Sequence, residues 1–118
     1  MPRLTRAVLV LLALVPRTAA AAPDYDPQSS DWNGLSELVT LAESEGIELR
    51  VVKDLDAEAL DPIDGLLVIY PRRPLPSASL VEFLRRGGRL ALADDFGEGQ
   101  GLLRRFGIER IPAPTGTA

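Results

Sequence analysis

The stretch from residue 65 to residue 97 constrains the fold of this chain more than any other part of the sequence. It begins with an apolar run at residues 66–70 and ends with a second one at 90–93, and neither run alternates polar with apolar residues. Such unbroken runs are typical of parallel strands that are covered on both faces. Between them four apolar residues recur at helical spacing: Leu80, Val81, Phe83 and Leu84. The stretch therefore predicts a strand, a helix packed on a sheet, and a second, parallel strand.

The flanking segments extend this unit into a small domain. Before it, the same patterns predict a helix over 32–45, a strand over 47–52 and a single helical turn over 57–60. The helix within the unit starts at Ser77 or Ser79. After the unit we expect a third helix near 102–106 and a last short strand over 108–111. Strands that are separated by helices predict a three-layer α/β/α arrangement with a small, mostly parallel sheet. We expect a single domain at 32–111, preceded by an N-terminal segment at 22–31 and followed by a flexible tail at 112–118.

The first 21 residues have the pattern of a secretory signal peptide. Arg3 and Arg6 precede an apolar run of nine residues at 7–15, and a small-residue tract at 18–22 follows. This order of basic, apolar and small residues is typical of a cleaved export signal, and nine apolar residues are too few to span a bilayer, which needs about 20. We therefore expect cleavage near Ala20–Ala21 and a periplasmic or extracellular location, with no membrane span in the mature chain.

The composition excludes several classes of function. The chain has no cysteine and no histidine, which excludes a Ser-His-Asp triad, thiolate catalysis, disulfides and ordinary structural zinc. Beyond the signal region the chain has 10 basic and 17 acidic side chains, a net charge of −7. An acidic domain is a poor partner for nucleic acid or an anionic membrane. We therefore expect no cofactor, no metal and no nucleic-acid partner.

Charged residues follow the two central predicted strands, at the edge where parallel sheets bind ligands. Arg72 and Arg73 come after the first strand, and Asp94 and Asp95 come after the second. The arginines could bind a carboxylate or phosphate, and the aspartates could bind a cation or act as acid and base. The simpler interpretation is that these residues make ion pairs and loop caps. The glycine-rich loop at 97–101 fails the dinucleotide fingerprint, which would need glycine at position 102.

Three segments together resemble a known family: NGLSELVTLAESEGIELRVV, then GLLVIYPRRPLPSASLVEFLRRGGRLALADDFG, then LLRRFGI. They are similar to a bacterial and archaeal domain of unknown function numbered forty-three fifty, which is related in fold to class I glutamine-amidotransferase-like domains. The resemblance implies a flavodoxin-like fold at or outside the cytoplasmic membrane. Members of the family are usually longer, so this chain is expected to be a short or truncated member. Amidotransferases of this fold need a cysteine and a histidine, so no catalytic residue carries over.

Taken together, these patterns predict a non-catalytic, exported α/β domain that binds another protein. One alternative is a domain that binds a small ligand or a cation through Arg72, Arg73, Asp94 and Asp95. A second and weaker alternative is a carboxylate-dependent hydrolase that uses Asp94 or Asp95 as its base.

Overall fold

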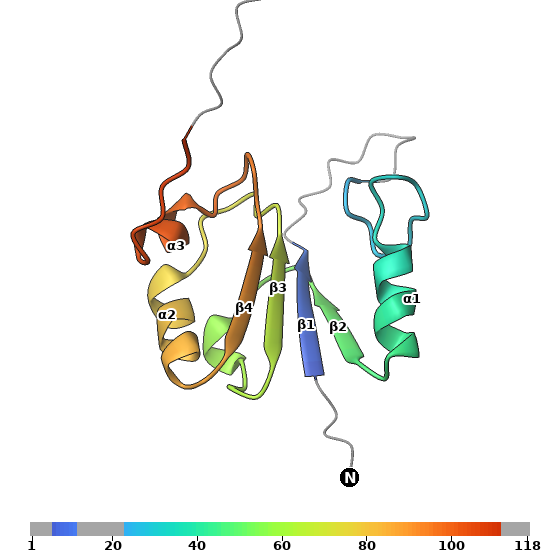
Figure 1. Ribbon diagram of the computed structural model, residues 1–118, viewed down its shortest axis with the longest axis horizontal. Helices are drawn as coiled ribbons and strands as arrows, with labels where there is room; N and C mark the ends of the chain where they lie inside the picture. Colours follow the sequence, from blue (N-terminus) through green and yellow to red (C-terminus); the bar gives the residue numbers. More distant parts are fainter. Residues whose placement is uncertain (1–5, 12–22, 112–118) are drawn as a thin grey trace, which may run out of the picture.

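The computed structural model describes residues 6–11 and 23–111, and for 6–11 it describes the backbone (Figure 1). In chain order the elements are β1 (Arg6–Leu11), α1 (Ser36–Ser44), β2 (Glu48–Val52), the 3₁₀ turn η1 (Ala57–Ala59), β3 (Gly65–Ile69), α2 (Ser77–Arg85), β4 (Arg89–Ala93) and α3 (Gln100–Arg104). Within these residues the sheet has four strands in the order β2-β1-β3-β4, and every neighbouring pair is parallel. The predicted α/β class with a small parallel sheet is therefore confirmed.

The central position of β1 differs from the prediction for the N-terminus. We predicted that residues 1–21 lie outside the domain, whereas Arg6–Leu11 pairs with β2 on one side and with β3 on the other. The physical reason is that a short unbroken apolar run suits a buried parallel strand as well as it suits the core of a signal peptide. The predicted cleavage position near Ala20–Ala21 lies outside the described residues.

One face of the sheet carries the main hydrophobic core. α2, α3 and η1 lie on this side, and α1 stands on the other (Figure 1). Leu66 and Val68 of β3 are buried there against Leu80 and Phe83 of α2. The remaining buried members of this core are Ala57, Leu60, Leu75 and Leu102. These residues all lie between positions 57 and 102, and Val52 and Leu55 are among the partly buried residues that pack against them.

The opposite face has a smaller apolar cluster under α1. Ile69 of β3 is buried there, and Leu67 lies two residues away on the same side because side chains alternate along a strand. Leu35, at the start of α1, and Leu49 of β2 pack against Ile69. This side of the sheet is less completely covered. α1 has one buried residue, Ala42, whereas α2 on the other face has two larger ones, Leu80 and Phe83.

The first helix is shorter than the predicted span of 32–45. A hydrogen-bonded turn precedes it, in which Ser36 N–H donates to the Ser29 carbonyl and Gly34 N–H donates to the Asp31 carbonyl. A Cβ at Gly34 would lie 2.1 Å from the Ser29 carbonyl oxygen, so the turn requires glycine there. The helix therefore starts at Ser36, and Trp32 is left 96% exposed in the turn.

The prediction of a last strand over 108–111 was wrong. These residues have no regular secondary structure, and Ile108 and Ile111 are exposed. The segment is instead held by Arg110, whose side chain reaches back to the loop after β4. In place of the predicted sheet pairing, the segment is held by the Arg110 side chain and by a hydrogen bond from Ile108 N–H to the Leu103 carbonyl at 3.1 Å.

Candidate functional site

An open hollow lies at the carboxyl ends of β3 and β4, where the sequence placed its candidate residues. Its volume is about 270 Å³. The residues that line it come from the loops after these two strands: Tyr70, Pro71, Arg72, Phe96, Gly97 and Glu98. Backbone hydrogen bonds join the two loops, since Tyr70 N–H donates to the Ala93 carbonyl at 2.8 Å and Glu98 N–H donates to the Pro71 carbonyl at 2.7 Å. We refer to this feature as the Tyr70–Phe96 hollow.

Tyr70, one of the lining residues, has an uncommon backbone conformation. Its φ angle is +45°, which a non-glycine residue adopts at a cost of about 1–3 kcal/mol. The Tyr70 ring lies 6.0 Å from the Tyr25 ring at an interplanar angle of 41°. Tyr25 also has a positive φ, of +64°. Two tyrosines with positive φ therefore meet where β3 ends, beside the position at which the strand order reverses.

The Asp94 carboxylate makes hydrogen bonds and an ion pair within the protein. Its Oδ1 accepts a hydrogen bond from Gly97 N–H at 2.6 Å, and its Oδ2 accepts one from Gly99 N–H at 2.8 Å. The side chain has 0% exposure, and the Arg110 guanidinium lies 3.5 Å from Oδ2. Both carboxylate oxygens thus hold the β4–α3 loop closed, which leaves no exposed atom of the Asp94 side chain for a ligand or a substrate.

Arg110 fixes the same loop from the C-terminal segment, and the sequence analysis did not identify it. Its guanidinium donates to the Asp95 carbonyl at 2.8 Å, to the Gly97 carbonyl at 2.8 Å and to the Gln100 Oε1 at 3.0 Å. These contacts span 10 to 15 positions along the chain, so no periodic pattern or local motif marks them. Arg110 therefore sets the shape of the loop that carries Phe96 and Gly97.

The remaining candidate residues are divided between the hollow and its surroundings. Arg72 lines the Tyr70–Phe96 hollow, whereas Arg73 forms an ion pair with Asp54 at 3.0 Å. Both partners of that pair are exposed, so its contribution is within about 0–1 kcal/mol. The exposed Asp95 accepts a hydrogen bond from the neighbouring Phe96 N–H. The structure thus places Arg72 and the loop of Asp94 and Asp95 around one hollow.

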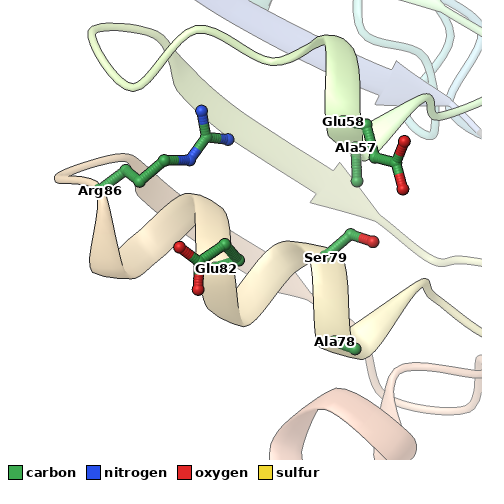
Figure 2. Close-up of a pocket in the computed structure, with 6 residues that line it drawn as sticks. All are labelled: Ala57, Glu58, Ala78, Ser79, Glu82 and Arg86. Carbon is green, nitrogen blue, oxygen red and sulfur yellow. The ribbon is translucent and has the colours of Figure 1, made fainter.

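A second hollow of about 400 Å³ lies between η1 and α2 (Figure 2). The small side chains of Ala57 in η1 and Ala78 in α2 line this hollow. The other lining residues are Glu58, Ser79, Glu82 and Arg86. Arg86 projects toward this space from the end of α2 (Figure 2). Within residues 6–11 and 23–111, no group of three or more acidic side chains is arranged to bind a metal ion.

These observations define a small parallel α/β domain with one polar and aromatic hollow at the carboxyl edge of its sheet. None of the helices described in the structure is both long and apolar enough to span a bilayer. A family model for a domain of unknown function, DUF4350, matches residues 27–118. The chain therefore belongs to this family, as the sequence resemblance predicted. Comparisons with curated proteins and with solved structures gave no match.

Proposed function

We propose that this protein is a non-catalytic, exported domain that binds another protein through the surface around the Tyr70–Phe96 hollow. The observation that carries this proposal is Phe96, whose side chain is 85% exposed at the edge of the hollow. Tyr70 and Arg72 lie in the same lining. Tyrosine and arginine are enriched among the residues that dominate binding energy at interfaces, and burying a phenylalanine ring contributes about 1.5–3 kcal/mol.

The lack of reactive groups supports a role without catalysis. The chain has no histidine and no cysteine, so it cannot supply the nucleophile and base that amidotransferases of the related fold require. Asp94 is buried under two backbone hydrogen bonds and an ion pair. A carboxylate-dependent hydrolase would have to rely on Asp95 alone, which makes this the weakest of the alternatives.

The proposal includes a flavodoxin-like, three-layer fold. The strand order β2-β1-β3-β4 supports it, because flavodoxin-like sheets begin with the order 2-1-3-4. In such sheets ligands bind where the order reverses, between the first and third strands. The Tyr25–Tyr70 pair lies beside this position, at the end of β3. The signal-peptide pattern of the first 21 residues is the sequence feature that favours a periplasmic or extracellular location.

The test is a crosslinking and binding experiment on Phe96. A photoreactive residue at position 96 should crosslink a protein in the cell envelope, and that protein is then purified. We expect Phe96→Ser to weaken its binding at least about 10-fold, because the aromatic contact is lost. Trp32→Ser is the matched control, since Trp32 is 96% exposed but lies in the turn before α1. Equal binding by Phe96→Ser and the wild type would contradict the proposal.

The hollow itself favours one second candidate, a domain that binds a small ligand. Arg72 and Glu98 give its lining both charges, and its volume is near the lower limit of about 300 Å³ for ligand pockets. Inorganic phosphate, Mg²⁺ or a free amino acid would then raise the melting temperature with concentration. We expect Arg72→Ala to abolish that rise, while Arg86→Ala, in the second hollow, retains it. No change in melting temperature with any of these probes would exclude this candidate for them.

A further inference from the structure

The sheet ends in two edge strands, β2 and β4, and these differ in their side chains. β2 carries Glu48 and Arg50, and charged residues on an edge strand disfavour pairing with another chain. β4 has one charged residue, Arg89 at its first position, and residues 90–93 are leucine and alanine. β4 also contains no proline, and its register with β3 continues from end to end without a bulge. The β4 edge therefore lacks the features with which natural edge strands avoid pairing.

The backbone of β4 directs hydrogen-bonding groups outward at this edge. Tyr70 N–H donates to the Ala93 carbonyl at 2.8 Å, so the odd-numbered residues of β4 direct their backbone groups toward β3. Because the direction alternates along a strand, Leu90 and Leu92 direct their N–H and C=O groups away from β3. In the described part of the chain, none of the backbone hydrogen bonds of loops, turns and caps uses these outward groups.

The surroundings of β4 leave its edge accessible. Among the described helices and strands, β3 and α2 contact β4, and α2 does so from the face of the main core. Ala91 and Ala93 are exposed on the other face, where they lie in register with Leu67 and Ile69. α1 contacts β2 at the far end of the sheet, so it does not cover these alanines (Figure 1). Their small side chains would let a further strand approach the edge.

We propose that β4 is the interface of a twofold-symmetric dimer, in which the β4 strands of two copies of this chain pair antiparallel. The strand is complementary to itself in this arrangement. With Ala91 on the twofold axis, Leu90 lies opposite the partner's Leu92, and both leucines use their outward backbone groups to form hydrogen bonds. Ala91 then lies opposite the partner's Ala91, and Arg89 lies opposite the partner's Ala93. No like charges meet across the pair.

The position of the axis follows from the sequence of β4. An axis at Leu90 places Leu92 opposite the partner's Gly88, and an axis at Leu92 places Leu90 opposite the partner's Asp94. The axis at Ala91 gives each leucine a leucine on the opposite strand. The dimer then has one continuous sheet, whose outermost strands are β2 of each copy. Because β2 carries charges that disfavour pairing, association stops at two copies.

The test uses charge substitutions at Ala91, which is exposed in one chain and lies opposite itself in the dimer. Light scattering during size-exclusion chromatography of the full chain, at high micromolar concentration, should give twice the 12.7 kDa mass of one chain. Ala91→Lys and Ala91→Glu should each give the mass of one chain, because like charges directly opposite each other destabilise a strand pair. An equal mixture of the two variants should recover the doubled mass, since lysine then lies opposite glutamate.

Val51→Lys is the matched control, because Val51 is 38% exposed on the other edge strand. It should keep the mass of the wild type. A wild-type chain that stays monomeric would overturn the proposal. Ala91 variants that remain dimeric on their own would show a different interface, and a mixture that stays monomeric would exclude the axis at Ala91. Either result also overturns the proposal.

Hydrogen exchange on the wild-type chain tests the pairing without a substitution. We expect the amides of Leu90 and Leu92 to exchange at least about 10-fold more slowly in the dimer than in a dilute, monomeric sample, because dimerisation pairs them. The amide of Ala93 should be protected in both samples, since it is directed toward β3. Equal exchange of the Leu92 amide in the two samples would overturn the proposal.

This inference does not depend on the proposed function, because it uses the edge of β4 and not the loops around the Tyr70–Phe96 hollow. Phe96→Ser should leave the mass of the dimer unchanged. Ala91→Lys should leave the crosslinking from position 96 unchanged. Loss of dimerisation and loss of binding at Phe96 are therefore separate results.

Discussion

Phe83→Ala is expected to lower the free energy of unfolding by about 3–5 kcal/mol, the usual cost of emptying a phenylalanine site in a core. Phe83 is 0% exposed and lies at the centre of the main core, between α2 and β3. The chain also approaches it closely at Gly88, where a Cβ would lie 2.4 Å from the ring. Because a domain of this size is stable by only about 5–15 kcal/mol, the variant should be partly unfolded in dilute urea.

The matched control for this prediction is Phe106→Ala. Phe106 is 52% exposed after α3, so its removal should change the free energy of unfolding by less than about 1 kcal/mol. Urea unfolding curves of both variants and the wild type, followed by circular dichroism, give the comparison. Similar midpoints for the two variants would contradict the assignment of the core to α2 and β3.

Asp94→Ala is expected to destabilise the protein by about 2–4 kcal/mol, although Asp94 lies in a loop. The change leaves the N–H groups of Gly97 and Gly99 without their acceptor and leaves Arg110 without its carboxylate. An unpaired buried donor costs about 1–3 kcal/mol, and breaking a buried ion pair costs more than an exposed one. Urea unfolding measures the loss.

The adjacent residue provides the control for Asp94. The Asp95 side chain is exposed and accepts a hydrogen bond from Phe96 N–H, while the bond from Arg110 goes to the Asp95 backbone carbonyl, which the substitution retains; Asp95→Ala should therefore cost less than about 0.5 kcal/mol. Arg110→Ala should destabilise in the same way as Asp94→Ala, and the double variant should lose less than the sum of the two. An equal effect at positions 94 and 95 would contradict a structural role for Asp94.

Those parts of the fold that depend on local pattern could be predicted from the sequence. β3 and β4 were both predicted to within one residue, from the apolar runs at 66–70 and 90–93. Both strands are unbroken apolar runs between clear turn signals, and α2 has a regular apolar face. Gly46 follows the first helix with a φ angle of +70°, a left-handed conformation that glycine commonly adopts at a helix end, so the end of α1 is also marked locally in the sequence.

Features that depend on contacts distant in sequence could not be predicted. The contacts of Arg110 join segments 10 or more positions apart, and the late start of α1 follows from hydrogen bonds within the preceding turn. The short apolar run in the first residues is compatible with both a strand and an export signal, so its place in the sheet could not be read from its composition. At the candidate site, the sequence identified the loops but not which carboxylate the protein would bury.

The order of the strands in the sheet also has a consequence for the timing of folding. β1 is synthesised first, yet Leu9 pairs with Val51 and with Leu67, which are 42 and 58 positions further along the chain. At a synthesis rate of 5–20 residues per second, the apolar segment waits roughly 3–12 s for its second neighbour. Pairing across such separations is itself slow, since the intervening chain must first be ordered. During this interval the segment has neither of its strand neighbours, so its backbone groups depend on the later arrival of both β2 and β3 for the pairing that they have in the folded sheet.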